Sequence, residues 1–293
     1  PIATKGSKPP FFCVPGTGGS VVYLRDLALA LNEHDRPFYG LQSPGLDGRT
    51  VPLESIEALA AENVKALLEF QPQGPYYLGG HSFGSWVAIE MAHQLARLGR
   101  EVAMVAVLDT SAPVERDLSA MAVRNDRQWL EAVADMLSHL SGKQAALELG
   151  SLDGLDWPAQ VDRFSKALIN SGILPADADR QEVRGLASVY RSQAQMRYEP
   201  AAGFPRVPVA LVRAEVALAD FVDGIPDAMK HDPTWGWREY ADGDVHLEAV
   251  PGDHLTMMTP PQCRAVAAAL HRILSSRDTA GAAARTPSQA EET

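Results

Sequence analysis

The segment Gly80-His81-Ser82-Phe83-Gly84 constrains the fold of this chain more than any other, because it sets a serine between two glycines. An apolar run from Tyr76 to Leu78 leads into a predicted tight turn at Gly79 to Gly84, and an amphipathic helix is predicted from Ser85 to Leu98. A G-x-S-x-G turn between a strand and a helix is typical of a serine whose hydroxyl is held outward, with no side chains crowding it. The segment therefore predicts that Ser82 is a nucleophile.

Strands and helices alternate along most of the chain. Apolar runs predict the strands, and amphipathic periods predict the helices between them. The other predicted strands are Phe11 to Val14, Pro37 to Leu41, Val102 to Leu108, Val207 to Val212 and Val245 to Val250, and the other helices are one capped by Ser20, one from Glu54 to Phe70 and one from Pro260-Pro261 to about Leu274. This alternation is typical of a parallel sheet with helices on its faces, so we expect an α/β fold.

The stretch 113–205 breaks the alternation, because it shows helical periods and no convincing strand. We expect an all-helical insertion there, with a helix starting at Asp179. Its apolar residues exceed what a helical pair can bury, so one face should cover the sheet above Ser82 as the roof of an apolar channel. Residues 1–10 are predicted to be a linker cut from a larger polypeptide, 11–274 the folded domain, and 275–293, which lack an apolar period, a disordered tail.

Charge and apolar patterning exclude two classes of protein. The chain carries 26 Lys and Arg against 37 Asp and Glu, a net charge of −11, whereas nucleic-acid binding needs a basic face. No apolar run approaches the roughly 20 residues that cross a bilayer, so we expect no membrane span. The opening residues lack a secretory signal pattern, and Cys13 and Cys263 are too few for a disulfide framework. We therefore expect both cysteines to be buried, unpaired thiols and the protein to be located in the reducing cytoplasm.

A nucleophilic serine needs a base and an acid, which in this arrangement follow in the order Ser, Asp or Glu, His, each after a strand. His254 is the predicted base, because it alone among the 8 histidines occupies a position directly after a strand end. The other histidines are interpreted as ordinary structural or solvated residues, with His81 pointing away from the turn. The acid stays open, since Asp109 follows the strand before the insertion, while Glu215 and Asp220 follow the strand after it.

Acyl transfer also needs two backbone N–H donors for the oxyanion that develops. One would come from Phe83, directly after the nucleophile, and the other from the loop after the first strand, where Thr17 is the candidate and Gly18 the alternative. That loop, Pro15-Gly16-Thr17-Gly18-Gly19, lacks the lysine and the glycine spacing of phosphate-binding loops. We therefore do not expect a nucleotide there.

Five blocks of sequence together resemble the thioesterase domains that terminate modular polyketide synthases and non-ribosomal peptide synthetases. They are Phe12 to Gly19, Pro37 to Gln42, Gly79 to Gly84, Leu108 to Thr110 and Val250 to Met258. The resemblance covers Phe11 to about Leu274 and implies an α/β-hydrolase fold, a mostly parallel central sheet flanked by helices, with a helical lid at 113–205. It also implies that the acid is Asp109 rather than Glu215. Ser85 stands where many relatives carry Gly or Ala, a departure that puts nothing catalytic in doubt.

The same resemblance implies a reaction and its partners. Ser82, activated by His254 and Asp109, would take an acyl, polyketide or peptidyl chain from the phosphopantetheine arm of an acyl or peptidyl carrier domain. Water, or an internal hydroxyl or amine, would then release the chain by hydrolysis or macrocyclisation. No metal and no cofactor of the domain's own is implied, the carrier is expected in cis, and a homodimer is left open. A discrete editing thioesterase acting in trans and a non-catalytic hydrolase-fold binding protein are the alternatives.

Overall fold

The computed structural model describes every residue except 114–124, 146–148, 218–228, 230 and 286–293. Its centre is a six-stranded sheet in the order β2-β1-β3-β4-β5-β6, in which each neighbouring pair of strands is parallel. The strands are β1 (Phe11–Val14), β2 (Phe38–Gly40), β3 (Tyr76–His81), β4 (Val102–Leu108), β5 (Val209–Val216) and β6 (His246–Asp253). The parallel sheet expected from the alternating pattern is confirmed.

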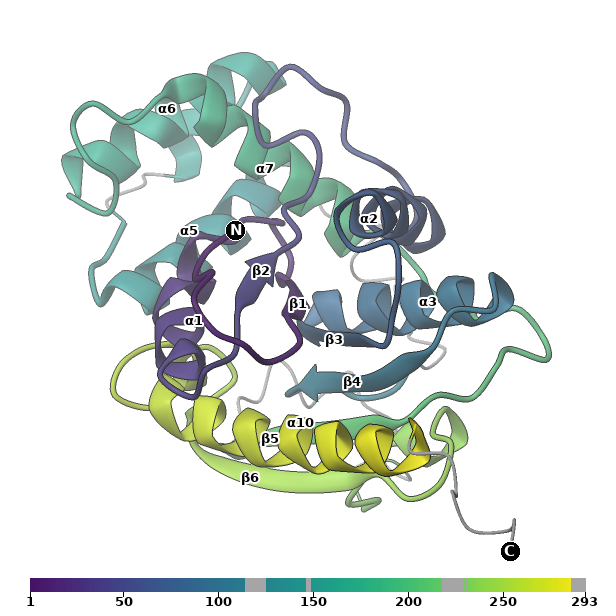
Figure 1. The fold of residues 1–293 in the computed structure, drawn as a ribbon. Helices are drawn as coiled ribbons and strands as arrows, with labels where there is room; N and C mark the ends of the chain where they lie inside the picture. The colour runs from purple at the N-terminus through teal and green to yellow at the C-terminus, as the bar shows by residue number, and fades with distance from the viewer. Residues whose placement is uncertain (114–124, 146–148, 218–228, 230, 286–293) are drawn as a thin grey trace, which may run out of the picture.

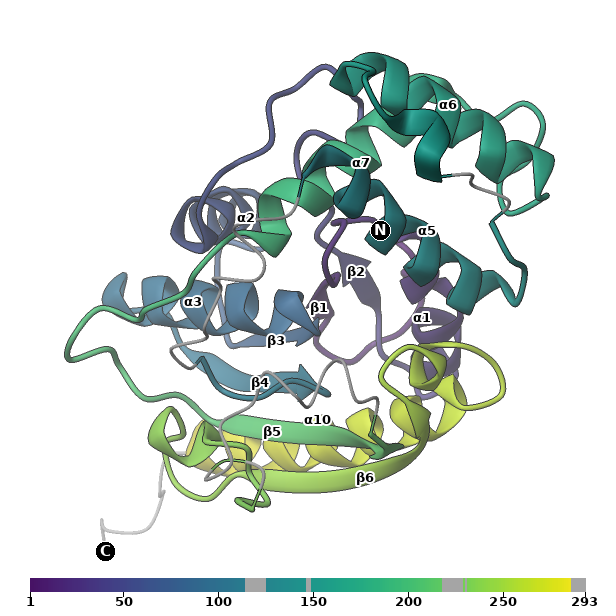
Figure 2. The ribbon, with the colours of Figure 1, turned by 180° about the vertical axis from the view of Figure 1, so that it is seen from behind.

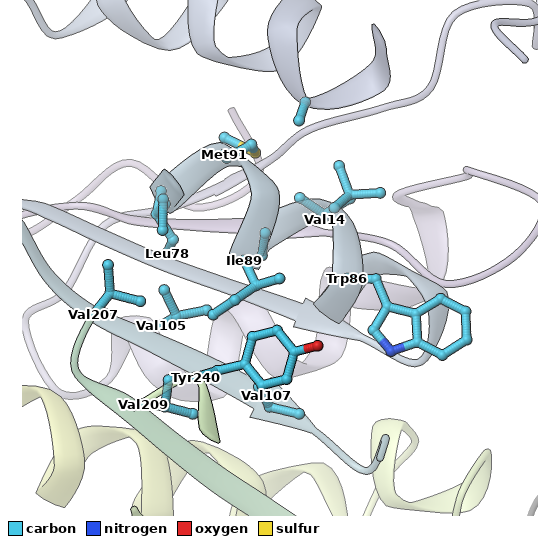
Figure 3. Packing of buried hydrophobic residues seen from close by; sticks show 14 of the residues in the cluster. Val14, Leu78, Trp86, Ile89, Met91, Val105, Val107, Val207, Val209 and Tyr240 are labelled. Carbon is cyan, nitrogen blue, oxygen red and sulfur yellow. The ribbon is translucent and has the colours of Figure 1, made fainter. Parts of the chain in front are cut away.

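Helices cover both faces of this sheet. Helices α2 (Ile56–Phe70) and α3 (Phe83–Arg97) lie on one face, and α1 (Arg25–Asn32) and α10 (Cys263–Arg285) lie on the other (Figure 1). Because alternate side chains of a strand point to opposite faces, Val107 of β4 joins the core under α3 (Figure 3), whereas its neighbour Ala106 joins the core under α10. The strands are buried on both sides, which is why they form continuous apolar runs in the sequence.

The helical insertion consists of three helices in the described residues. They are α5 (Asp126–Ser141), α6 (Trp157–Asn170) and α7 (Arg180–Ala194), and we call them together the lid. Both views show the lid as a group apart from the two helical layers (Figures 1 and 2). Each helix starts at an Asn or Asp whose side chain accepts a backbone N–H of the first turn, namely Asn125, Asp156 and Asp179. These caps satisfy donors that a helix leaves open at its start.

The lid has an apolar core of its own. Leu130 of α5, Phe164 and Leu168 of α6 and Ala187 of α7 are buried against one another, separately from both sheet cores. The sequence analysis predicted that part of this apolar surface covers the sheet, because two helices alone could not bury it. Three helices bury it among themselves, so these four residues stabilise the lid rather than line a channel.

The start of α1 differs from the predicted one. Ser20 does not cap the helix; a 3-10 turn at Val22–Leu24 comes first, and Leu24 occupies the N-cap position without a side-chain hydrogen bond. The first residues also pack more closely than a linker would, because Ala3 is buried and pairs with Phe38 of β2 in an antiparallel bridge.

The end of α10 differs as well. The helix continues past Leu274 to Arg285, so residues 275–285 are helical where a disordered tail was predicted, and the rest of that tail lies outside the described residues. One contact that holds this extension is an ion pair that no apolar period reveals: the guanidinium of Arg36, which is fully buried, binds the carboxylate of Asp278. Among the described residues, no helix has the length and apolar character that a membrane crossing requires.

The segment after the lid is fixed to α3 by a buried polar cluster around Glu90. The Tyr198 hydroxyl donates to Glu90 Oε2 at 2.8 Å, and Gln94 Nε2 donates to Oε1 at 3.0 Å. The ring of His93 lies beside the same carboxylate, with Nδ1 3.6 Å from Oε2. Burial opposes ionisation, but the hydrogen bonds from His93, Gln94 and Tyr198 outweigh it and lower the pKa of Glu90 to about 2.

Replacing Tyr198 with Phe should destabilise the fold in a pH-dependent way. We expect the free energy of unfolding at pH 7 to fall by about 1–3 kcal/mol, because a buried carboxylate loses a donor. Glu90 has a lower pKa folded than its ordinary 4.5, so its contribution is present above about pH 4.5 and is lost as the pH falls toward 2. Urea denaturation should therefore show the difference between wild type and Y198F shrinking below pH 4.5.

A matched control is Tyr76→Phe, because the Tyr76 hydroxyl donates to the backbone carbonyl of Gln71, which does not titrate. Its loss of stability should stay constant over the same pH range. A constant difference for Y198F as well would show that Tyr198 contributes packing and not the ionisation of Glu90.

Candidate active site

The order in which the chain adds strands to the sheet reverses between β1 and β3. Strand β1 pairs with β2 on one side and with β3 on the other, so the chain leaves β1 toward one edge and returns to build the opposite edge. In α/β sheets, ligands bind beyond the carboxyl ends of the strands at such a point. The glycine loop at 15–19 follows β1, and Ser82 follows β3, so both lie at this crevice.

Ser82 is held in a strained turn between β3 and α3. Its backbone has φ 53° and ψ −130°, a left-handed conformation that is costly for a residue with a Cβ. The surrounding structure enforces it: a Cβ on Gly80 would lie 2.1 Å from the Gly84 carbonyl oxygen, and one on Gly84 would lie 2.3 Å from that of Val14. The Ser82 side chain makes no capping bond to α3. The flanking glycines are therefore required by backbone contact.

The glycine loop lies directly against Ser82. A Cβ on Gly16 would stand 3.3 Å from the Ser82 Cβ, which is tighter than ordinary contact between side chains. The backbone donors of the loop are therefore near the serine.

An acid and a base are paired at the same edge of the sheet. His254 Nδ1 lies 2.9 Å from Asp109 Oδ2, and the backbone N–H of Ala214 donates to Asp109 Oδ1 at 2.8 Å. Both side chains are buried. Because a carboxylate only accepts, Nδ1 carries the proton and Nε2 is the basic nitrogen of His254.

The pairing favours one of the two predicted positions for the acid. Asp109 directly follows β4, where its backbone N–H donates to Val212 of β5, and its carboxylate turns toward His254. Glu215 is exposed near the end of β5. Asp220 lies outside the described residues. The geometry therefore supports the position that the family resemblance favoured.

A side-chain network that the sequence did not predict joins the three loops of the site. The phenol oxygen of Tyr23 accepts the backbone N–H of Gly16 at 2.7 Å and lies 3.0 Å from Nδ1 of His81. Nε2 of His81 lies 2.8 Å from the backbone carbonyl oxygen of His254. That carbonyl only accepts, so Nε2 of His81 carries the proton, and Tyr23 donates to Nδ1. The loops that carry Ser82 and His254 are thus in direct contact through His81.

His81 acts in this network as a neutral ring. Burial disfavours its cation, the nearby His254 disfavours it further, and together they lower the pKa of His81 to about 3. The two imidazole rings lie 4.8 Å apart, centroid to centroid. His81 was interpreted as an ordinary residue, but its ring links Tyr23 to the backbone of His254. A tyrosine 7 positions from Gly16 belongs to no motif, so this link could not be predicted from the sequence.

The two predicted oxyanion donors belong to segments that meet at Ser82, the start of α3 and the glycine loop. Phe83 is the first residue of α3, and backbone N–H groups in the first turn of a helix have no partner within that helix. In the glycine loop, the N–H of Gly18 donates to Oε1 of Gln193 at 2.9 Å. That bond favours Thr17 over Gly18 as the second donor, and both Phe83 and Thr17 remain predictions.

Comparison with known proteins agrees with this geometry. A protein-family model described as thioesterase domain matches residues 9–274. Chondramide synthase of Chondromyces crocatus is 29% identical over 279 residues, which are 93% of this chain and 7% of the synthase. The four-domain nonribosomal peptide synthetase AB3403, solved with AMP and glycine, is 25% identical with a TM-score of 0.74, covering 92% of this chain and 20% of that one. The Vlm2 thioesterase domain is 20% identical with a TM-score of 0.61, covering 92% and 95%.

Replacing Asp109 with Asn should remove most of the reactivity of this site. The side-chain amide would donate to Nδ1 of His254, so the proton would move to Nε2 and the ring could no longer act as a base. We expect kcat for a small activated ester to fall by about three to four orders of magnitude. The remaining carbonyl oxygen keeps the bond from Ala214, so the thermal midpoint should stay close to that of wild type. Glu215→Gln is the matched control and should turn over at the wild-type rate; the reverse ranking would move the acid to β5.

Replacing Tyr23 with Phe should impair the site without affecting substrate binding. The backbone N–H of Gly16 and Nδ1 of His81 would both lose their partner, so the glycine loop and the base would be less well fixed. We expect kcat for the same ester to fall about tenfold with little change in KM. Tyr76→Phe removes a hydroxyl at the other end of β3 and should leave kcat unchanged. Equal kcat values for Y23F and Y76F would show that the network does not position the reacting groups.

Proposed function

This chain belongs to the thioesterase domain family, and from that premise we propose that it takes an acyl or peptidyl chain from a phosphopantetheinyl carrier domain onto Ser82 and releases it by hydrolysis or cyclisation. The α/β-hydrolase fold expected from the resemblance is confirmed by the parallel sheet and by the solved structures that share it, the Vlm2 thioesterase domain among them. The observation that carries the proposal is the buried His254–Asp109 pair, which lies at the sheet edge where Ser82 occupies a strained turn.

In the proposed first half-reaction, Ser82 attacks the thioester carbonyl carbon while its hydroxyl proton passes to Nε2 of His254. The carboxylate of Asp109 stabilises the imidazolium that forms. The oxyanion receives the backbone N–H groups of Phe83 and Thr17. Collapse of the tetrahedral intermediate breaks the carbon–sulfur bond, and the leaving thiolate takes the proton from His254. The products are an ester on Ser82 and a free thiol on the carrier.

The second half-reaction reverses these roles. Water, or a hydroxyl or amine of the bound chain, gives its proton to His254 and attacks the ester carbonyl. The carbon–oxygen bond to Ser82 then breaks, and the serine oxygen recovers a proton from the imidazolium. Water yields an acid, whereas an internal nucleophile yields a ring. In this scheme His81 stays neutral, because burial and the neighbouring His254 lower its pKa to about 3.

The proposed partner is a carrier domain on the same polypeptide. Chondramide synthase and AB3403 are much longer than this chain, which matches 7% of the former and 20% of the latter. A tether raises the effective concentration of the carrier without any need for charge attraction, which suits a domain with a net charge of −11. A discrete thioesterase acting in trans would use the same residues, but these matches favour the carrier in cis. The buried His254–Asp109 pair disfavours the alternative of a non-catalytic binding protein, because binding alone does not need a base and an acid.

Three further expectations remain predictions. The chemistry above runs on the side chains of the domain, so we propose that it needs no metal and no cofactor of its own, the pantetheine arm being part of the partner. A homodimer is left open, and a cytoplasmic location is likewise expected on sequence grounds alone. Cys13 and Cys263 are both free and buried, in line with that expectation.

The covalent step predicts a single reactive serine. A serine-directed fluorophosphonate should add once to the wild-type chain, and peptide mapping should place the adduct on Ser82. Ser82→Ala should abolish labelling. Ser85→Ala is the control on the same peptide: it removes a buried hydroxyl that donates to the Gly80 carbonyl, and it should still be labelled. A lone adduct at any other serine would refute the proposed nucleophile.

Release itself is tested with an acyl chain loaded onto a phosphopantetheinylated carrier domain. Wild type should free the chain as an acid or a ring, read by mass spectrometry of both the carrier and the product. S82A should leave the thioester on the carrier. Labelling of Ser82 without any release would show a serine hydrolase that does not act on carrier thioesters.

A further inference from the structure

The lid touches the glycine loop directly through α7. A Cβ on Gly18 would lie 3.3 Å from Cδ1 of Leu186 and 3.6 Å from Cδ2 of Tyr190, both on α7. Gly18 has φ +99°, a backbone conformation that glycine adopts most readily, so its lack of a side chain lets α7 approach the loop. The same helix is anchored further along, where Ser192 donates to the Leu53 carbonyl oxygen at 3.0 Å. The lid is therefore seated on the loop that would supply an oxyanion donor.

Gln193, the next residue of α7, makes the polar contact at this seat. It is 3% exposed, and both ends of its amide are bonded: Oε1 accepts the N–H of Gly18 at 2.9 Å, and Nε2 donates to Oγ of Ser43 at 2.8 Å. Ser43 in turn donates its backbone N–H to the carbonyl of Gly19 at 3.0 Å. These contacts form a closed ring, in which Gln193 of the lid bonds the loop directly at Gly18 and indirectly, through Ser43, at Gly19. Breaking this ring without replacing its bonds would leave buried polar groups unpaired, which is costly.

The ring matters because each peptide group of the loop is held by a different partner. The N–H of Gly16 is bound by Tyr23. The Gly16 carbonyl, which belongs to the same peptide group as the Thr17 N–H, accepts from the N–H of Gly19 at 3.0 Å. The N–H of Gly18 is bound by Gln193. One of these restraints comes from the body of the domain, one lies within the loop, and one comes from the lid, so the direction of the Thr17 N–H depends in part on where α7 sits.

We infer that Gln193 is a positioning residue that couples docking of the lid to the shape of the oxyanion hole. With α7 seated, Gln193 takes up the Gly18 N–H and fixes the loop so that the Thr17 N–H faces the reacting carbonyl. With α7 lifted, the Gly18 N–H is released and the loop loses one of its restraints. The site is thus fully formed only under a closed lid. The inference rests on the proposed acyl transfer at Ser82, since it concerns the donors of that reaction.

The test compares two buried glutamines of the lid. Gln193→Met keeps the length of the side chain and removes both hydrogen bonds. Gln160→Met is the matched control: Gln160 is also buried, but its amide donates to Leu155 within the lid and touches neither the loop nor Ser82. Gln193→Glu is the rescue, because a carboxyl oxygen accepts the Gly18 N–H in either protonation state and can also bond the Ser43 hydroxyl.

Two readouts on the full chain separate positioning from packing. One is kcat and KM for p-nitrophenyl butyrate, and the other is the affinity for butylboronic acid, whose tetrahedral serine adduct places an oxygen in the oxyanion hole. We expect Q193M to lower kcat about ten- to a hundredfold with KM nearly unchanged, and to weaken boronate binding in parallel. Q193E should recover most of both, and Q160M should match wild type. Equal kcat and boronate affinity in Q193M and Q160M would overturn the inference.

A measurement on the wild-type chain covers the case in which Q193M fails to fold. Hydrogen exchange in low urea should show the Gly18 amide protected and losing protection together with the amides of α7. Exchange of Gly18 independent of α7 would refute the coupling. The ester and boronate assays need only a reactive Ser82. Failure to release a carrier-bound chain would therefore refute the proposed function. The ester and boronate assays would still decide the role of Gln193.

Discussion

The close approach of two backbone segments at Gly80 and Gly84 is the contact on which the site depends. With no Cβ at either position, the first turn of α3 can pack against the carbonyl of Val14 at the end of β1, and the chain can turn sharply enough to hold Ser82 at φ 53°. The same contact fixes the spacing between the serine and the glycine loop, because that loop begins where β1 ends. One steric condition thus sets the positions of Ser82 and the neighbouring loop together.

The sequence predicted best those elements whose signal is local. Strand β4 has the predicted bounds because its apolar run begins and ends sharply, and α2 starts within two residues of the predicted Glu54. The start of α1 was wrong because a serine before a helical period suggested a cap, whereas a 3-10 turn supplies the first turn instead. The end of α10 was wrong because Asp278 is fixed by a residue 242 positions earlier, a distance that no window of sequence covers.

The site shows the same division. The motif around Ser82 and the strand-end position of His254 come from short patterns, and the resemblance to thioesterase domains chose Asp109 before the geometry did. Tyr23 and Gln193 were not predicted. Each is a single polar residue on a helical segment, and each has a partner far away in the chain: Tyr23 lies 58 positions before His81, and Gln193 lies 175 positions after Gly18. Such contacts depend on how finished elements pack, so they follow from the fold and not from any motif.

The ion pair between Arg36 and Asp278 bears on where this domain can be cut and joined to another chain. The Arg36 guanidinium is enclosed by the ring of Tyr77, 5.0 Å from its centroid, by the carbonyl of Pro9 at 2.8 Å and by the Asp278 carboxylate. The family match ends at residue 274, and a graft cut there would bury a cation with its counter-ion removed. A graft of this domain therefore has to be longer than the segment that the family model matches. It has to include Pro9 at one end and Asp278 at the other.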